Sequence, residues 1–276
     1  MGFFAGGGDL GTLALGLVIT GAVSGLVAGM LGVGGGIVIV PVMYHVLGVA
    51  GVPQDLRMHI AVGTSLATIV PTSLSSLSSH ARKGAVDWAL LKRWIGPMLA
   101  GVVLGSLLAG VARGQVLTLI FGLVALPVAA QLAFGKERWR LADRLPGGIG
   151  GAALPFGIGG VSTMMGIGGG TIGVPSMTLC GYPIHRAVGT ASAFGAIISI
   201  PGAIGAALAG WHVEHLPPWS YGYVNLMGFA IIAPVAFAAA PLGAAWAHTA
   251  DTKKLRRMFA LFVAITAAKM LWDTLG

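Results

Sequence analysis

The stretch GVGGG at residues 32–36 decides the fold of this chain, because it occurs twice. The second copy reads GIGGG at residues 166–170, and in both copies a proline follows five residues after the last glycine, at Pro41 and Pro175. A glycine costs a helix about 1 kcal/mol relative to alanine, so each run predicts a break in a helix.

A second motif follows each glycine run. The block Ala-Val-Gly-Thr occupies residues 61–64 and again residues 187–190, with a histidine two residues before it in both places. Two linked motifs that recur in the same order indicate an internal duplication. We expect an N-terminal tail over 1–9, a first transmembrane repeat over 10–134, a basic linker over 135–145 and a second transmembrane repeat over 146–276.

The composition is that of a membrane protein. Hydrophobic residues make up 56% of the chain and charged residues only 9%, against about 25% charged residues in soluble domains. The formal charge is +8, but the basic residues lie between apolar runs, where they are typical of cytoplasmic anchors and not of a nucleic-acid surface. A single cysteine, Cys180, excludes an internal disulfide and a cysteine-rich metal cluster, and we expect no metal or cofactor. The chain starts without the basic segment of a signal peptide, so the first apolar run is expected to be retained.

The apolar runs predict an all-α polytopic membrane protein with about 8–10 membrane segments, since about 20 apolar residues span a bilayer. The long runs cover residues 10–31, 59–77, 94–112, 116–134, 147–165, 187–209, 221–246 and 258–275. Two shorter runs, 37–49 and 171–179, directly follow the glycine stretches, and whether they cross fully is left open. Irregular backbone at membrane depth is tolerated only where it is buried in protein or lines a watery cavity. The glycine stretches therefore predict two broken or re-entrant helix pairs and a candidate site.

Charge counting orients the chain. Twelve of the sixteen Lys and Arg residues fall in three segments, 80–93, 136–144 and 250–257, which the positive-inside rule assigns to the cytoplasm. The loop 211–219, with two Trp and no Lys or Arg, then faces outside. If each broken pair is re-entrant, each half crosses an odd number of times, which predicts two inverted-topology repeats. Such repeats are typical of secondary transporters, with the substrate near the midplane.

The doubled GxGGG element followed by Ala-Val-Gly-Thr resembles the sulfite exporter TauE/SafE family of bacterial membrane proteins, over nearly the whole chain. The resemblance implies a two-repeat permease in the bacterial cytoplasmic (inner) membrane that exports small sulfur-containing anions such as sulfite or an organosulfonate. The alternative is an importer or a channel for small organic or inorganic anions. The second block continues with Ala191 and Ser192 where the first has Ser65 and Leu66, so the two half-sites differ chemically.

An oxyanion needs hydrogen-bond donors and positive potential, which helix N-termini at the glycine breaks supply. Hydroxyl groups near the breaks add neutral donors, although each could instead bond its own helix backbone. Arg186, at the start of a span, is a candidate for attracting anions or an interfacial anchor. The candidate substrate-binding residues are Gly34, Gly35, Gly36, Thr64, Ser65, Gly168, Gly169, Gly170, Thr171, Thr190, Ser192 and Arg186.

The residue types that the predicted spans lack exclude other classes of protein. Glu137 and Glu214 are the only glutamates, both in predicted loops, and no aspartate lies in the middle of a span. A proton- or sodium-coupled carrier often uses a buried carboxylate, so the membrane potential is the expected driving force. No HExxH motif or paired histidine and carboxylate indicates an enzyme, and no strand precedes the glycines as a dinucleotide site requires. The expected partners are a small anion and lipid. The stripes Gly21, Gly25, Gly29 and Gly101, Gly105 serve either a homodimer or packing within the chain.

Overall fold

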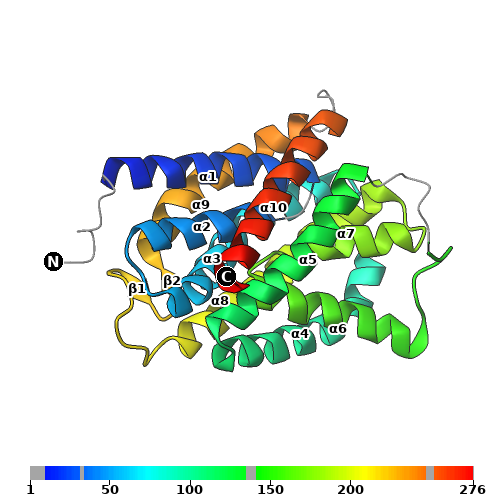
Figure 1. Cartoon of the computed structure of the whole chain (residues 1–276). Helices are drawn as coiled ribbons and strands as arrows, with labels where there is room; N and C mark the ends of the chain where they lie inside the picture. Colours follow the sequence, from blue (N-terminus) through cyan, green and yellow to red (C-terminus); the bar gives the residue numbers. More distant parts are fainter. Residues whose placement is uncertain (1–9, 32–33, 135–140, 247–251, 276) are drawn as a thin grey trace.

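The computed structural model describes residues 10–31, 34–134, 141–246 and 252–275 (Figure 1). The tail predicted over 1–9 lies outside these ranges. Within them the chain forms ten helices and one pair of two-residue strands. These are α1 (Leu10–Leu31), α2 (Gly36–Val49), α3 (Gln54–Arg82), α4 (Trp88–Val111), α5 (Gly114–Phe134), α6 (Gly148–Met165), α7 (Gly170–Leu179), α8 (Ile184–Ala209), β1 (Ser220–Tyr221), β2 (Val224–Asn225), α9 (Leu226–Trp246) and α10 (Thr252–Leu275).

The expectation of an all-α polytopic membrane protein is confirmed. In the described ranges, seven helices are long and apolar enough to cross a membrane, and α1 and α2 contain shorter apolar stretches. Large apolar side chains point outward, including Leu107 of α4, Phe237 of α9 and Leu261 of α10. Hydroxyl side chains such as Thr64, Thr68 and Ser162 are fully buried instead. This inside-out distribution is that of a protein whose solvent is lipid.

The two short helices each belong to a re-entrant pair. The N–H groups of Leu141 and Ala142, in the segment before α6, both donate to the carbonyl oxygen of Leu179 at the end of α7. The far ends of α6 and α7 therefore lie on the same side of the molecule. Similarly, Leu17 near the start of α1 and Leu47 near the end of α2 line one small cavity. Both glycine stretches thus sit at the tips of helix hairpins whose other ends lie on one side of the molecule.

Helices from the two halves of the chain pack against each other. α1 lies along α9, α4 lies along α6, α3 packs on α8, and α5 lies along α10 (Figure 1). Glycines let these backbones approach: a methyl group on Gly25 would lie 2.3 Å from the carbonyl oxygen of Ala236, and one on Gly105 would lie 2.5 Å from that of Gly160. The predicted glycine stripes therefore act in packing within the chain.

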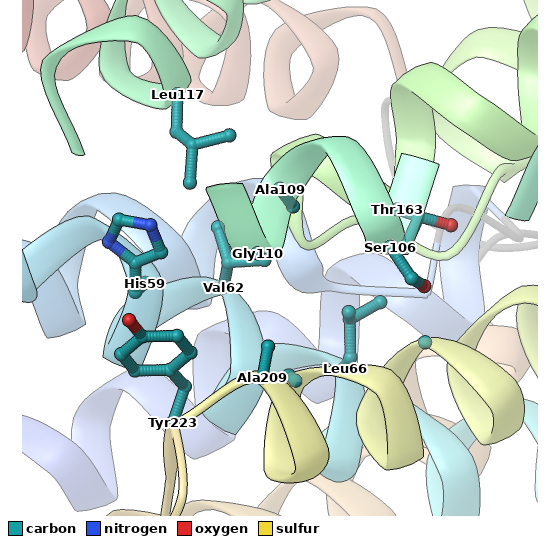
Figure 2. A pocket seen from close by; sticks show the side chains of 12 residues that line it. His59, Val62, Leu66, Ser106, Ala109, Gly110, Leu117, Thr163, Ala209 and Tyr223 are labelled. Atoms are coloured by element: carbon teal, nitrogen blue, oxygen red, sulfur yellow. The ribbon is translucent and has the colours of Figure 1, made fainter. Parts of the chain in front are cut away.

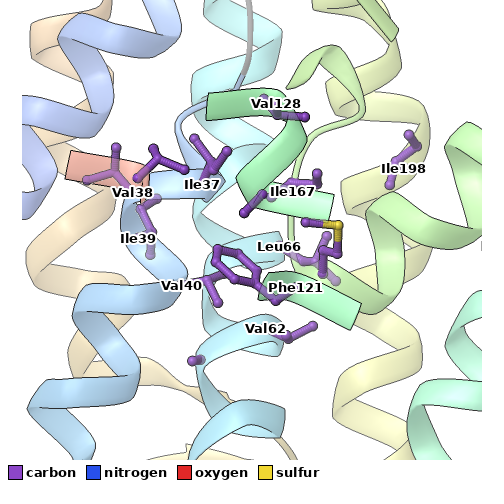
Figure 3. Close-up of a cluster of buried hydrophobic side chains, with 14 of the residues drawn as sticks. Ile37, Val38, Ile39, Val40, Val62, Leu66, Phe121, Val128, Ile167 and Ile198 are labelled. Carbon is purple, nitrogen blue, oxygen red and sulfur yellow. The ribbon is translucent and has the colours of Figure 1, made fainter. Parts of the chain in front are cut away.

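The apolar core surrounds the tips of the hairpins. Ile37 and Val40 of α2 pack with Leu66 of α3, Phe121 of α5 and Ile167 of the second glycine turn (Figure 3). All five side chains are at most 1% exposed. The glycine turns are thus held between rigid, closely packed neighbours.

Several predicted boundaries were wrong. The basic segment 80–93 was expected to be a loop, but α3 runs to Arg82 and α4 begins at Trp88. The segment 250–257 largely belongs to α10, which begins at Thr252. Long basic side chains tolerate a helix end at the membrane surface because their charged groups reach the water. The helix predicted from residue 221 begins only at Leu226, because residues 220–221 and 224–225 pair as short strands. In the segment 136–144, only residues 141–144 are described, and they are not helical.

Candidate functional site

The two glycine turns meet at the centre of the molecule. A methyl group on Gly34 would lie 3.3 Å from the Cα of Gly168, and one on Gly168 would lie 3.4 Å from the Cα of Gly34. A methyl group on Gly36 would lie only 2.5 Å from the carbonyl oxygen of Gly166. The backbones of the two halves are therefore in direct contact here, with no room for side chains.

The two turns have nearly the same local geometry. Gly35 precedes α2 with φ 72° and ψ −12°, and Gly169 precedes α7 with φ 72° and ψ −25°. This left-handed region is costly for residues with a Cβ, which explains the glycines. In the described structure neither helix start has a side-chain cap. Both N-terminal ends, with their partial positive charge, thus point into the centre.

One predicted hydroxyl joins the two turns. Ser65 of α3 donates to the carbonyl oxygen of Gly166 over 2.7 Å, which links the first half to the second turn. Thr171 is buried in the first turn of α7, beside Gly170. Ser192 donates to the carbonyl oxygen of Gly189, one turn back in its own helix. The structure thus brings the glycines, Ser65 and Thr171 together, and Ser192 serves its own helix.

The two threonines of the Ala-Val-Gly-Thr blocks bind the other half of the chain. The Thr64 hydroxyl oxygen accepts from the N–H of Asn225 over 2.9 Å, and the Thr190 hydroxyl oxygen accepts from the N–H of Asp87 over 3.0 Å. Asn225 and Asp87 in turn cap α9 and α4, by accepting from the N–H groups of Gly228 and Leu90. The glycine before each threonine also touches the partner segment: methyl groups there would lie 2.5 Å from the carbonyl oxygens of Tyr223 and Ala85, respectively. Both threonines therefore fix the start of a helix in the opposite half.

Arg186 is paired with a carboxylate. Its guanidinium lies 3.0 Å from a carboxylate oxygen of Asp87, and the hydroxyl of Tyr182 donates to the same oxygen. The Tyr182 hydroxyl, the Leu90 N–H and Arg186 hold the pKa of Asp87 below its ordinary value of 3.8. Burial, and then the neighbouring Asp87, raise the pKa of Tyr182 to about 12. The guanidinium of Arg186, which was a candidate for attracting a substrate anion, is thus already paired with the carboxylate of Asp87.

Two cavities lie on the side of the molecule where α3 and α5 begin. The larger one, of about 570 Å³, is lined by Asp55, Arg113 and Gln115, and the smaller one, of about 20 Å³, by Leu66, Ser106 and Thr163. His59, Gly110 and Tyr223 line both cavities. Figure 2 shows the rings of His59 and Tyr223 at one end of the smaller cavity, with Ser106 and Thr163 at the other. None of the candidate glycines lines either cavity.

No group of three or more metal-ligating side chains gathers in the described ranges. The sequence interpretation missed the capping residues Asp87 and Asn225 and the aromatic residues Tyr182 and Tyr223. An Asp or Asn directly before a long apolar run is a helix-start signal, so the two caps were detectable. Their pairing with threonines more than 100 residues away carries no local signal.

A helical polytopic membrane protein with two re-entrant hairpins that meet at glycine turns defines the class of this chain: a membrane transporter. The chain belongs to the sulfite exporter TauE/SafE family, whose model matches residues 17–270, so the resemblance seen in the sequence is confirmed.

Relatives from distant organisms agree with this family. A probable membrane transporter protein of Haemophilus influenzae is 30% identical over 263 residues, which cover 94% of this chain and 98% of the relative. A probable membrane transporter protein of Methanocaldococcus jannaschii is 26% identical over 229 residues, covering 80% and 78% of the two chains. No solved structure matches the chain significantly.

Proposed function

We propose that the chain is a secondary transporter that exports small sulfur-containing anions, such as sulfite or an organosulfonate, across the bacterial cytoplasmic (inner) membrane. The observation that carries this proposal is the meeting of Gly34 and Gly168, which brings the uncapped N-termini of α2 and α7 to one point. Backbone N–H groups at helix N-termini bind oxyanions without any positively charged side chain. The substrate binds between the two turns, near the midplane.

The chemistry of this position suits an anion that must also leave. The first turns of α2 and α7 offer neutral donors, and the Ser65 hydroxyl lies between the two halves. A lysine or arginine would bind a sulfonate more tightly and slow its release. Specificity then comes from the size of the gap that opens between the glycines, because only small groups fit where a methyl group would already collide.

Transport requires the two halves to part. The turns are in contact, so an anion enters between them only when the hairpins α1–α2 and α6–α7 separate. We place the two halves in opposite orientations in the membrane, as inverted repeats with the basic segments 80–93, 136–144 and 250–257 in the cytoplasm. The reciprocal contacts of Thr64 with Asn225 and of Thr190 with Asp87 support this arrangement. Alternating access follows from rocking one half against the other.

The membrane potential supplies the driving force. An inside-negative potential favours the exit of an anion by about 2.3 kcal/mol per charge for each 100 mV. Flux of sulfite and of methanesulfonate from proteoliposomes with an imposed voltage tests the proposal. We expect outward flux that rises with inside-negative voltage, saturates with substrate and is lost in Gly36→Ala. Flux that ignores voltage would refute the driving force, and the absence of flux for every sulfur anion would refute the substrate class.

The same assay separates the alternatives. A carrier shows flux that accelerates when substrate is present on the opposite side, whereas a channel conducts without such exchange. Uptake that is faster than export at zero voltage would identify an importer. The matched control is Gly157→Ala, at a surface position of α6 where an added methyl group meets nothing within 4 Å.

A further inference from the structure

The ring of His59 touches two carbonyl oxygens at once. Its Nδ1 lies 3.1 Å from the carbonyl oxygen of Asp55, in the same helix, and its Nε2 lies 3.1 Å from that of Ala112, at the end of α4. A carbonyl oxygen only accepts hydrogen bonds, so both contacts are hydrogen bonds only when both ring nitrogens carry a hydrogen. A neutral imidazole has one N–H and the cationic form has two. The observed geometry is therefore complete only with protonated His59.

An aromatic ring also covers one face of the imidazole. His59 is 8% exposed, and the ring of Tyr223 stacks on it with centroids 4.7 Å apart and planes inclined by 29°. An aromatic face within about 6 Å stabilises a cation. Two carbonyl oxygens at the ring edge and one aromatic face thus surround His59.

This ring pair sits at the boundary between the two cavities. His59, Tyr223 and Gly110 line both the open cavity of about 570 Å³ and the narrow one of about 20 Å³ beneath it. Ser106 lines the narrow cavity, and its solvent-inaccessible hydroxyl has no hydrogen-bond partner among the described residues. Beyond it lie Leu66 and Thr163, which are close in sequence to the glycine-turn contacts Ser65 and Gly166. The pair thus lies where the larger cavity, called the vestibule below, meets the smaller, narrow cavity.

Resting on the proposed function, we propose that His59 is a proton-binding site at the outer gate of the transport path, and that a proton on its ring holds the gate shut. The protonated ring ties α3 to the corner between α4 and α5 through Ala112. Loss of the proton leaves a lone pair facing a carbonyl oxygen, which breaks one of the two contacts. The corner is then free to move away from Tyr223, and the narrow cavity opens to the vestibule.

Other titratable groups around the ring do not explain such a switch. They are Asp55 from α3, Arg113 from the turn between α4 and α5, and Tyr223 from the turn between β1 and β2. Burial, and then Asp55, raise the pKa of Tyr223 above its ordinary value of 10, so its hydroxyl stays protonated near neutral pH. Leu117 of α5 and Ala206 of α8, which also line the narrow cavity, carry no charge.

The test measures access to the narrow cavity and needs no transport. In a Cys180→Ala background, Ser106→Cys places a reporter below the ring pair, and Gln115→Cys places a control reporter in the vestibule. Both react with a small anionic methanethiosulfonate added from outside, between about pH 5.5 and about pH 8, where imidazole side chains change charge. The ratio of the two rates removes the pH dependence of the thiol itself.

We expect this ratio to rise about tenfold from the lower to the higher pH, because the loss of one hydrogen bond from a charged donor shifts an equilibrium by about that factor. His59→Gln should make the ratio independent of pH. His185→Gln, the exposed histidine at the matching place in the second half, should leave it unchanged. A flat ratio in the protein with His59 intact would overturn the gate, and so would an unaltered rise in His59→Gln. Failure to transport sulfur anions, with the labelling as expected, would refute the proposed function alone.

Discussion

The hydroxyl oxygen of Thr64 accepts a hydrogen bond from the backbone N–H of Asn225, 161 residues further along the chain. The contact between Thr190 and Asp87 repeats this arrangement with the two halves exchanged. Each half therefore binds, in the other half, the residue that directly precedes a membrane-length helix. This pair of contacts ties α3 and α8, the two longest helices in the described ranges, to segments of the opposite half.

Removing either threonine hydroxyl should destabilise the protein. Thr64→Val and Thr190→Val each leave a backbone N–H without its acceptor, which costs about 1–3 kcal/mol. The melting temperature of the purified protein in detergent measures the effect. Thr68→Val is the matched control, because the Thr68 hydroxyl only donates to the carbonyl oxygen of Thr64 in the same helix. If Thr64→Val melted at the same temperature as Thr68→Val, the hydrogen bond between the halves would not contribute to stability.

Alanine at the two left-handed glycines should have unequal effects. Both Gly35→Ala and Gly169→Ala place a Cβ at φ 72°, which costs about 1–2 kcal/mol. The new methyl group of Gly35→Ala would lie 2.7 Å from the backbone carbonyl of Ser24, which cannot move easily. The methyl group of Gly169→Ala would lie 2.4 Å from the end of the Ile198 side chain, which can rotate away.

We therefore expect Gly35→Ala to lower the melting temperature more than Gly169→Ala does. Gly157→Ala, with open space around it and a helical backbone, should be neutral or stabilise by up to about 1 kcal/mol. The conformational cost is the same at both turns, so equal losses of melting temperature would contradict the described difference in their contacts.

The cluster of Asp87, Tyr182 and Arg186 should make stability depend on pH at both extremes. The pKa of Asp87 is lowered in the folded protein, so its contribution is fully present above the ordinary value of 3.8 and is lost as pH falls through the lower folded value. The pKa of Tyr182 is raised to about 12, so stability is also lost as pH rises from 10 toward 12.

Tyr182→Phe removes the first cause of the Asp87 shift, and it removes the tyrosine hydroxyl that titrates at high pH. The acid loss of melting temperature should then be smaller, because the pKa of Asp87 is lowered less. The alkaline loss assigned to this tyrosine should disappear. Melting curves of both proteins across the pH range measure this, with Tyr221→Phe, at an exposed tyrosine of β1, as the control. Identical pH profiles for the wild-type protein and Tyr182→Phe would contradict the role of the cluster.

Opposite orientation of the halves predicts which side each loop faces. Cys180, which ends α7, should react with a membrane-impermeant maleimide only after the cells are permeabilised. In a Cys180→Ala background, Trp219→Cys, at a residue 72% exposed before β1, should react in intact spheroplasts. The reverse pattern would overturn the orientation, and labelling of both residues on one side would show that α8 does not cross the membrane between them.

Much of the fold was predictable because its signals are local. The ends of α1 at Leu31 and of α6 at Met165 follow from the glycine runs, which stop a helix wherever they occur. The starts of α3 and α8 were misplaced by five and three residues, respectively, because Pro53 and Pro183 precede them and mark helix starts that a search for apolar runs overlooks.

The site was less predictable than the fold. The glycine turns were identified because they repeat, but their mutual contact depends on how four long helices pack. Arg186 was considered free to meet an anion, and the structure pairs it with Asp87, 99 residues away. Hydroxyl partners also cannot be read from sequence, since Ser65 reaches the second turn whereas Ser192 bonds its own helix.

The packing of α1 along α9 also constrains how the protein is made. α1 leaves the ribosome first, yet the helix that covers it, α9, begins only at Leu226. During most of synthesis α1 therefore waits in the lipid or beside the insertion machinery without its main neighbour. In the finished structure the helices of the two halves pack mainly against each other. Neither half can therefore complete its packing before the other has been translated.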